Sequence, residues 1–420
     1  MTTTLKTIPK DWQKINLGVA CNFERGIEPG ADAYNSEGIG GRFLRVVDIT
    51  ESRNDPVYVD IRTTKKLKEN DIALTLDGTI GAVRTGLNGI YSTGIRKVSF
   101  KNGVNSSRLL YYILQSDTIQ RIIDVYASGS TIKHASSAIP HLFTVIPNSS
   151  SERNKIAEIL STVDEAIEKT DALIEKYKRM KTGMMQDLFR YGIDDKEKIR
   201  SEKTHKFKKS PLGKIPEEWG FKKLGSLREF ITSGSRAWAQ YYSDEGALFI
   251  RIGNLSRENI RIRFDDVVYV SPPNNSEGNR TNIKTGDVLV SITADLGIVA
   301  LAPRSLRDAY VNQHIALLRF TDIETLSPWV AFYLWSNGGQ KQFQVLNDGG
   351  AKAGLNLPTV DSILIPLPSK EERKKIIQSM MSIEEIILKE STEKYKLERI
   401  KNGLMEDLLT GIVRVNPLVK

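Results

Sequence analysis

The residue patterns that usually mark an active site are missing from this sequence. It has no GxxxxGK[ST] phosphate loop, no HExxH or CxxC motif, no GxSxG motif, and no GxGxxG turn after a predicted strand. The four histidines are far apart and share no metal-binding spacing; they are His134, His141, His205 and His314. We therefore predict that this chain has no catalytic residue, no bound metal and no cofactor of its own.

A short motif at residues 271–274 is similar to one used in catalysis. DNA amino-methyltransferases use Asp, Asn or Ser followed by two prolines and an aromatic residue, whose ring stacks on the flipped base. Here Ser271 and two prolines are followed by Asn274, and no glycine-rich S-adenosylmethionine loop precedes them. We interpret the motif as a turn. The acidic pairs Asp265–Asp266 and Glu217–Glu218 lie in turn-like or helix-cap contexts and show no sign of acid–base catalysis.

The composition is that of an ordinary globular protein in a reducing compartment. A chain of 420 residues, 40% hydrophobic and 26% charged, is too long for one core and indicates at least two domains. The net charge of +9 includes no polybasic tail, so any nucleic-acid binding must come from local patches. A single cysteine, Cys21, excludes an internal disulfide, and no apolar run suits a membrane span or signal peptide. We expect a cytoplasmic location without membrane contact.

The longest regular pattern lies at residues 151–192 and predicts one long helix. It contains no proline, and its apolar positions alternate in steps of four and three, which places them in one narrow seam. Ser151 is a plausible cap at the start and Gly192 a plausible stop. A helix of this length needs a partner along its seam. The predicted packing residues are Ile156, Leu160, Val163, Ile167, Ile174, Tyr177 and Leu188.

The same pattern returns about 220 residues later, at residues 369–410. The segment Glu152–Ile156 is echoed by residues 372–376, and residues 183–188 are echoed by residues 403–408. The middle of the second seam carries Glu390 and Lys394, which predicts either a register change or a polar contact there. Its apolar packing residues are Ile376, Met380, Ile383, Ile387, Leu397, Leu404 and Leu408.

The residues before each long helix also form a repeat. An Ile-Pro-x-x-Trp opening places Trp12 and Trp219 at matching points, where we predict that each anchors the first strand of a domain. Short β-branched runs bounded by Gly, Asn and Asp then predict strands. The matching runs are residues 43–49 and 249–255, 70–75 and 286–291, 95–100 and 315–320, and 143–147 and 363–366. Residues 109–115 and 329–335 predict a short amphipathic helix in each copy.

These patterns predict an α+β fold with a pseudo-two-fold internal repeat. The first long helix leaves the first α/β domain, and the equivalent second helix leaves the other domain, so the two must run antiparallel like a coiled coil. The expected segments are a domain at 1–150, a helix at 151–192, a linker at 193–213, a domain at 214–368, a helix at 369–410 and a tail at 411–420.

The order of these motifs in both halves resembles the specificity subunit of type I restriction–modification systems. The resemblance covers nearly the whole chain and implies that each domain is a target recognition domain for one half of a bipartite double-stranded DNA target. It implies that the helix pair is a spacer and a docking surface for two methyltransferase subunits. Those partners would hold S-adenosylmethionine and methylate adenine, and motor-nuclease subunits would complete the restriction enzyme.

A target recognition domain must place side chains against base edges, with Arg or Lys for guanine and Asn or Gln for adenine. We expect loops to carry them. The DNA-binding candidates in the first domain are Arg25, Asn35, Arg84, Lys133 and His134. Those in the second domain are Arg236, Arg257, Arg280, Asn312, Gln313, His314 and Lys352.

Two other classes of function stay open from the sequence. A coiled-coil scaffold with two β-rich domains for protein or carbohydrate would show no salt-dependent DNA affinity. A self-contained DNA-modifying enzyme would need a cofactor loop, which this sequence lacks.

Overall fold

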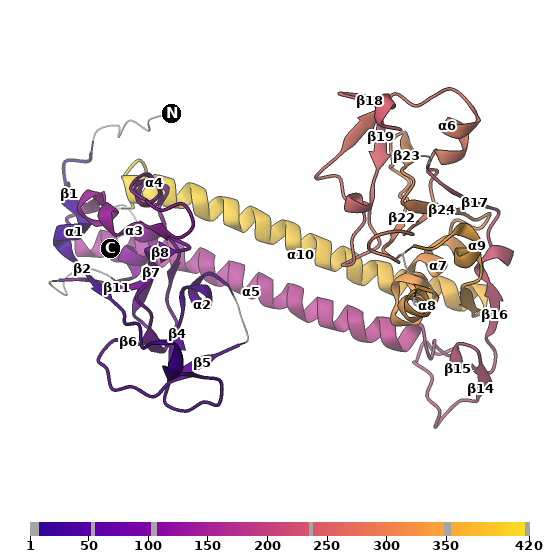
Figure 1. Cartoon of the computed structure of the whole chain (residues 1–420), viewed down its shortest axis with the longest axis horizontal. Helices are drawn as coiled ribbons and strands as arrows, with labels where there is room; N and C mark the ends of the chain where they lie inside the picture. The colour runs from indigo at the N-terminus through magenta and orange to yellow at the C-terminus, as the bar shows by residue number, and fades with distance from the viewer. Residues whose placement is uncertain (1–7, 52–54, 102–106, 235–237, 348–353, 416–420) are drawn as a thin grey trace. The chain divides into compact units, whose positions relative to one another are not determined.

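The computed structural model describes residues 8–51, 55–101, 107–234, 238–347 and 354–415 (Figure 1). The chain forms two compact units, and each takes a part of both long helices. Unit 1 comprises residues 1–171 and 392–420, and unit 2 comprises residues 172–391. The predicted boundary at residue 150 falls at the start of the first long helix, and compact unit 1 extends along that helix to residue 171.

The globular part of unit 1 is built from short strands and a few short helices. The strands are β1 (Trp12–Asn16), β2 (Cys21–Arg25), β3 (Tyr34–Asn35), β4 (Gly41–Leu44), β5 (Val57–Val59), β6 (Lys66–Leu67), β7 (Ile72–Thr75), β8 (Asp77–Gly78), β9 (Val83–Arg84), β10 (Gly89–Tyr91), β11 (Ile95–Phe100), β12 (Lys133–His134) and β13 (Phe143–Pro147). The helices are α1 (Leu17–Ala20), α2 (Val46–Thr50), α3 (Ser107–Gln115) and α4 (Asp117–Val125), with 3-10 turns η1 (Ala31–Ala33) and η2 (Ser136–His141).

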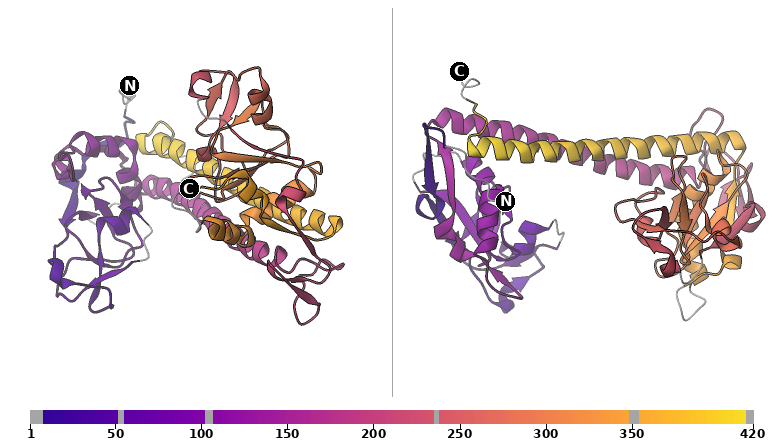
Figure 2. Two further views of the ribbon diagram at one scale, coloured as in Figure 1. Left: turned by 45° about the vertical axis from the view of Figure 1, so that its right-hand side comes forward. Right: turned by 90° about the horizontal axis from the view of Figure 1, so that it is seen from above.

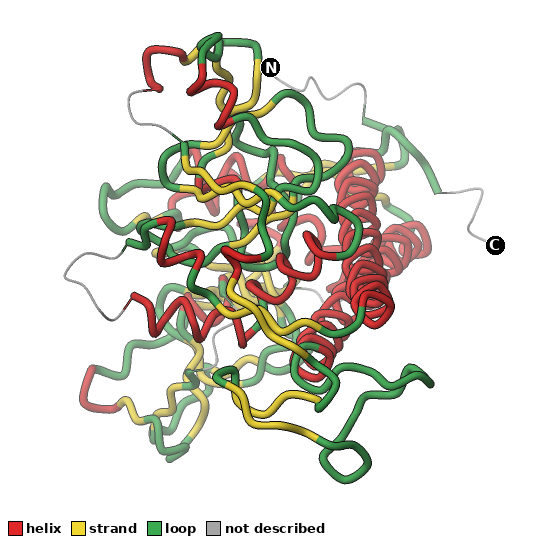
Figure 3. The backbone as a smooth tube through the Cα atoms, turned by 90° about the vertical axis from the view of Figure 1, so that its right-hand side faces the viewer, coloured by secondary structure: helices red, strands yellow, loops and turns green. Residues whose placement is uncertain are grey.

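Unit 2 repeats this plan, with short strands joined by long loops (Figure 3). Its strands are β14 (Phe207–Ser210), β15 (Gly213–Pro216), β16 (Gly220–Lys223), β17 (Phe230–Ser233), β18 (Tyr242–Ser243), β19 (Ala247–Ile250), β20 (Val268–Val270), β21 (Val288–Ser291), β22 (Val299–Leu301), β23 (Ala309–Val311), β24 (Ile315–Arg319) and β25 (Leu364–Leu367). Its helices are α6 (Ser276–Thr281), α7 (Leu326–Trp335), α8 (Asn337–Asn347) and α9 (Leu357–Asp361), with 3-10 turns η3 (Leu224–Ser226), η4 (Trp238–Tyr241) and η5 (Ile252–Asn254).

Three sheets of the two units match in strand order, except that unit 1 adds β6 at the edge of its second sheet. A four-stranded sheet has the order β2-β11-β7-β9 in unit 1 and β17-β24-β21-β22 in unit 2. A second sheet contains β3-β5-β4-β10 or β18-β20-β19-β23, and in both copies its last pair, β4 with β10 or β19 with β23, is parallel. The opening and closing strands pair as β1-β13 and β16-β25. The predicted α+β repeat is therefore confirmed at the level of topology.

Two predicted strands are shorter than expected because a polar side chain turns the backbone. Residues 43–49 and 249–255 begin as strands β4 and β19 but continue as α2 and η5. The side chain of Asp48 accepts a hydrogen bond from the Arg45 backbone N–H at 2.8 Å, and Asn254 accepts one from Arg251 at 2.9 Å. These local bonds satisfy the backbone in a helical turn, which outweighs the strand preference of the neighbouring Val and Ile residues.

The two long helices are α5 (Ser150–Leu188) and α10 (Lys370–Thr410). The first helix ends four residues before Gly192, which has a left-handed backbone with φ of 62°. The expected linker at 193–213 is ordered and packs against unit 2, since Ile193 and Arg200 are buried and β14 and β15 form a hairpin. It is thus part of the fold of unit 2.

Within each unit the segment of α5 lies beside the segment of α10 (Figures 1 and 2). In unit 1, Asp164 contacts Lys401 and Asp171 contacts Lys394, each at 2.7 Å. The contacts advance seven residues along α5 and retreat seven along α10, so the helices are antiparallel. The predicted packing residues are all buried or half-buried: Ile156, Leu160, Val163, Ile167, Ile174, Tyr177, Leu188, Ile376, Met380, Ile383, Ile387, Leu397, Leu404 and Leu408.

The polar positions of the seam form ion pairs between the helices. Lys394, which interrupts the second seam, bonds to Asp171 at 2.7 Å, so the interruption is a polar contact. Lys181 is 7% exposed and bonds to Glu384 at 2.9 Å in unit 2. The repeat relates this pair to Asp164 and Lys401 in unit 1. Charged seam positions fix the register of a helix pair, because a slipped register would leave them buried without partners.

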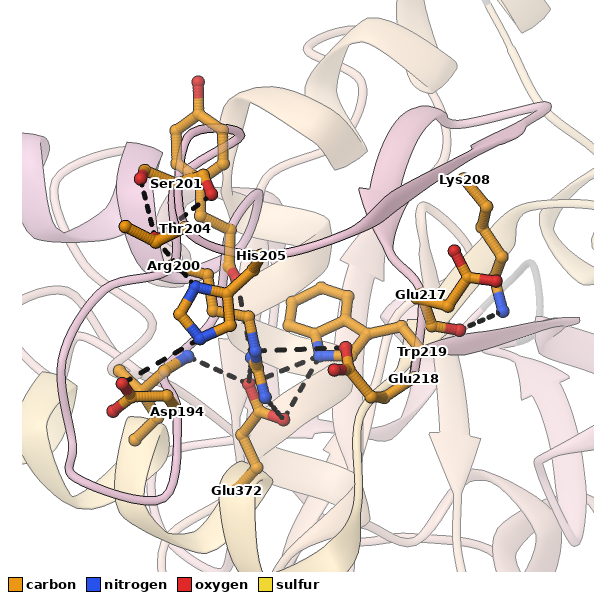
Figure 4. Close-up of polar contacts among 12 residues, drawn as sticks. Asp194, Arg200, Ser201, Thr204, His205, Lys208, Glu217, Glu218, Trp219 and Glu372 are labelled. Carbon is orange, nitrogen blue, oxygen red and sulfur yellow. Dashed lines mark hydrogen bonds and ion pairs between the residues drawn. The ribbon is translucent and has the colours of Figure 1, made fainter.

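A buried carboxylate at the start of α10 joins three distant segments of unit 2. Glu372 accepts hydrogen bonds from Arg200 at 2.5 and 3.2 Å, from the Trp219 indole N–H at 3.2 and 3.3 Å, and from the Ile193 backbone N–H at 2.9 Å (Figure 4). Gly192 leaves room for this cluster, since a Cβ there would lie 2.2 Å from the Glu372 carboxylate. The cluster thereby joins the segment after α5, the start of α10 and Trp219, which directly precedes β16.

Unit 1 contains the matching cluster with the roles of the helices exchanged. Glu152, near the start of α5, is 1% exposed and accepts hydrogen bonds from Arg414 at 2.8 and 3.0 Å. Arg414 follows the end of α10 and also bonds to Asp11, the neighbour of the buried Trp12. Each unit is therefore closed by an arginine that follows one long helix and a glutamate that begins the other.

We expect Arg200→Ala to destabilise unit 2 by about 3–5 kcal/mol, because it leaves the Glu372 carboxylate buried without its cation. Hydrogen exchange of the backbone amides at the start of α10 measures the change, and the matching amides of unit 1 serve as an internal reference. The control is Arg179→Ala, an exposed position on α5. A loss below about 1 kcal/mol, as is typical of a surface ion pair, would contradict a structural role for this cluster.

Candidate nucleic-acid interface

Three of the five candidate residues of domain 1 meet at one end of its four-stranded sheet. Arg25 ends β2 and donates a hydrogen bond to the Thr93 carbonyl at 3.4 Å. Arg96, which pairs with Arg25 across the β2–β11 ladder, donates to the same carbonyl at 2.5 Å. The β12 strand, Lys133–His134, lies beside β8 in the same cluster. The exposed side chains here are Arg25, Lys133 and His134.

A buried arginine supports the exposed histidine of this cluster. Arg96 is 5% exposed and contacts Asp77 at 3.1 Å and the Ser136 hydroxyl at 2.7 Å. The other carboxylate oxygen of Asp77 contacts His134 Nδ1 at 2.8 Å. Burial lowers the pKa of Arg96, and the Asp77 charge opposes that shift. The chain Ser136–Arg96–Asp77–His134 therefore fixes a surface side chain from the interior.

The structure places Asn35 and Arg84 in other roles. Asn35 donates to the carbonyls of Ile39 at 3.0 Å and Tyr58 at 3.2 Å, and it accepts from the Ile39 N–H, so its amide shapes a loop. Arg84 is half-buried on β9 and donates to the Asp48 carbonyl at 3.1 Å. Their polar groups are occupied by backbone within the domain, which makes both weaker candidates for base contacts.

The same end of the sheet in unit 2 gathers a different set of side chains. Arg280, the last basic residue of α6, donates to the Thr232 hydroxyl at 2.6 Å and to the Ser233 carbonyl at 2.5 Å. Ser233 ends β17, the counterpart of β2, so it stands where Arg25 stands in unit 1. Residues 312–314 form the turn from β23 to β24, the counterpart of the turn at Thr93.

Within this turn the three polar residues divide their roles. Asn312 is 7% exposed, and its side chain accepts from the His314 backbone N–H at 3.1 Å, so it shapes the turn. His314 contacts the Thr293 hydroxyl through Nδ1 at 2.6 Å and the Gln313 amide through Nε2 at 3.0 Å. Gln313 and His314 are both half-buried, and their side chains contact each other at the surface.

The remaining candidates of domain 2 lie elsewhere or outside the described residues. Arg257 bonds to Asp295, to the Leu296 carbonyl at 2.7 Å and to Gln340 at 3.1 Å, beside a cavity of about 440 Å³ that Lys181 also lines. It is therefore tied to the loop facing the long helices. Arg236 and Lys352 lie outside the residues that the structure describes.

Among the residues that the structure describes, there is no group of three His, Cys, Asp or Glu side chains that could hold a metal ion. Burial raises the pKa of Cys21 to about 12, so its thiol stays protonated at neutral pH. No helix in the described part of the chain is long and apolar enough to cross a membrane.

Comparison with known proteins decides what this duplicated surface belongs to. The family model for the type I restriction modification DNA specificity domain matches the chain twice, at residues 9–176 and 216–399. The chain belongs to the type I DNA specificity family. It is a specificity subunit with a DNA target recognition domain in each half, and such a subunit is not an enzyme by itself.

Its relatives extend over nearly the whole chain. It is 25% identical to the type I restriction enzyme MjaVIII specificity subunit of Methanocaldococcus jannaschii, over 98% of this chain and 95% of the relative. It is 20% identical to the EcoBI specificity subunit of Escherichia coli, over 89% and 79%. The crystal structure of the S subunit from M. genitalium shares its fold with a TM-score of 0.61 at 16% identity, covering 97% of this chain and 99% of that one.

Sequence reasoning missed the residues that support this specificity subunit's surface. Arg96 lies inside a predicted strand, and Asp77 lies between a predicted strand and the glycines at positions 78 and 81, so neither stands out as a binding residue. A usable signal exists for Arg96, since alternation places it on the same face of the strand as Val98 and Phe100, where an arginine needs a buried partner. Asp77 and Thr293, which follow the matching strands β7 and β21, differ in charge.

We expect Arg25→Ala and Lys133→Ala each to weaken DNA binding and to lower its salt dependence, because each removes a positive charge from the interface. Loss of one such charge reduces the slope of log K against log salt by about one. Lys101→Ala is the matched control, since it is exposed at the other end of β11. Fluorescence anisotropy of the full chain with a labelled duplex at several salt concentrations measures both quantities. Equal slopes for all three variants would place the interface elsewhere.

Proposed function

We propose that this specificity subunit recognises a bipartite double-stranded DNA target, with one half-site for each unit. The observation that carries the proposal is the duplicated meeting point at the end of the four-stranded sheet. The end of β2 and the turn before β11 in unit 1 match the end of β17 and the turn before β24 in unit 2, but Arg25, Lys133 and His134 gather there in one unit and Arg280, Gln313 and His314 in the other. A shared scaffold with different surface side chains suits two domains that read different sequences.

The long helices supply the spacing between the half-sites in this proposal. Each helix is continuous over about forty residues, and the pairs Lys181–Glu384 and Asp164–Lys401 fix an antiparallel register in each unit. A packed helix pair is stiff. Its length would therefore set the number of base pairs between the half-sites, without protein contacts to those base pairs.

The same helices offer a surface for methyltransferase subunits. In unit 2, Leu173 and Met180 on α5 are 39% and 45% exposed, and Met381 and Leu388 on α10 are 44% and 48% exposed. Each pair is seven residues apart, which is the spacing of a seam that receives another helix. We propose that two methyltransferase subunits bind the long helices and that one of them binds this surface of unit 2. They would hold S-adenosylmethionine and methylate the target, with motor-nuclease subunits added for cleavage.

We expect that exchanging residues 1–150 for the same region of another specificity subunit changes only one half of the methylated target. Sequencing of methylated positions in cells that contain the methyltransferase partner, with and without the chimaera, measures this. The reciprocal exchange of residues 214–368 is the control and must change the other half alone. A chimaera that alters both half-sites, or neither, would show that the units do not read independently.

We expect that seven residues inserted into each long helix widen the gap between half-sites by about three base pairs, at 1.5 Å per helical residue and 3.4 Å per base pair. The insertions belong between Asp171 and Ala172 and between Glu393 and Lys394, which keeps the Asp171–Lys394 pair within unit 1. Seven residues nearly preserve the helix face. Three-residue insertions at the same points rotate the seam and are expected to abolish assembly. An unchanged gap with the longer helices would refute the spacer role.

A further inference from the structure

His134 is held in one orientation before any ligand binds. The backbone N–H and C=O of His134 bond to Ser128 at 2.8 and 2.9 Å, which closes the loop 128–134 into a tight turn. Gly129 has φ of 98° inside this turn, and a Cβ there would lie 2.1 Å from the Ile132 carbonyl oxygen. On its other side the strand pairs with β8 in the register His134 to Asp77. The histidine therefore presents a preorganised side chain that is 58% exposed.

The partner of Nδ1 decides which ring nitrogen can act as an acceptor. An ionised carboxylate only accepts hydrogen bonds, so the Asp77 oxygen at 2.8 Å requires the proton of a neutral imidazole to lie on Nδ1. The lone pair is then on Nε2, and no partner for Nε2 occurs among the described residues. Arg96 neutralises Asp77 from behind and keeps its carboxylate oriented.

Resting on the proposed function, we propose that His134 is a specificity-determining residue that accepts a hydrogen bond through Nε2 from an exocyclic amine of its half-site. In the major groove such amines are N6 of adenine and N4 of cytosine. Asp77 and Arg96 are positioning residues, because they act only through the orientation and tautomer of His134.

Unit 2 shows why this assignment belongs to unit 1. His314 is also held through Nδ1, by the neutral hydroxyl of Thr293, but its Nε2 already contacts Gln313 at 3.0 Å. The histidine of unit 2 therefore lacks the open acceptor that His134 has. At the position of unit 2 that matches Asp77, the residue is Thr293.

The first experiment is selection of bound duplexes from a randomised library by the full chain, followed by sequencing. The wild-type chain must select a two-part motif, and failure to do so would argue against the proposed function itself. We expect His134→Ala to reduce the preference at one base pair of one half-site by roughly tenfold, with the other half-site unchanged. The control is His141→Ala, an exposed histidine of the same unit that stacks on Tyr126.

The second experiment removes the amine from the DNA instead of the acceptor from the protein. At the affected position, purine replaces adenine or 2-pyrimidinone replaces cytosine, and the affinity of the full chain is measured. We expect the wild-type chain to lose roughly tenfold in affinity, and His134→Ala to be insensitive to the change. Asp77→Asn should also become insensitive while its salt dependence stays that of the wild type, which a merely structural defect would not produce.

Two results would overturn the assignment. One is a selected motif that His134→Ala leaves unchanged in both halves. The other is wild-type affinity that stays unchanged when the exocyclic amine of the affected base pair is removed, on whichever strand that amine lies.

Discussion

The fold depends on a buried ion pair that joins the start of one long helix to the chain just beyond the end of the other. In unit 2 it is Glu372 with Arg200, and in unit 1 it is Glu152 with Arg414. Burying a carboxylate costs free energy unless its cation and its hydrogen-bond donors are present. Moving either helix end away would leave the carboxylate buried without its arginine, which would destabilise the fold strongly. The pair therefore adds positional constraint where two antiparallel helices could otherwise slide along an apolar seam.

This constraint also explains why the two units cannot be cut from the sequence as continuous domains. Val415 and Leu408, near the C-terminus, are buried in the same core as Trp12 and Leu17, near the N-terminus. Each recognition domain is completed by the far end of the helix that belongs to the other copy in sequence. Two chemically similar ion pairs, at Arg200 and Arg414, thus close one compact unit each.

Much of this fold could be predicted from the sequence because its strongest signals are periodic or duplicated. Each of these patterns occurs in both copies of the repeat. Together they predict the seam residues, the anchors Trp12 and Trp219, and helices α3 and α7. Helix α8 is not among the elements predicted from the sequence, and its opening Asn-Gly-Gly is typical of a turn. It forms because Gly339 packs closely on α7, where a Cβ would lie 2.4 Å from the Leu334 carbonyl oxygen, and because Gln340 bonds to that carbonyl at 2.9 Å.

The site was less predictable, because residue type does not tell whether a polar group is already occupied. Arg257 and Asn35 have the chemistry of base contacts, yet both bond within their own domain. His134 differs only through Asp77 and Arg96, which are distant in sequence and meet it through the β8–β12 pairing. In the proposed role of His134, a substitution behind the surface alters which base the domain prefers while the exposed residue stays the same, so part of the specificity would lie in the buried residues that support it.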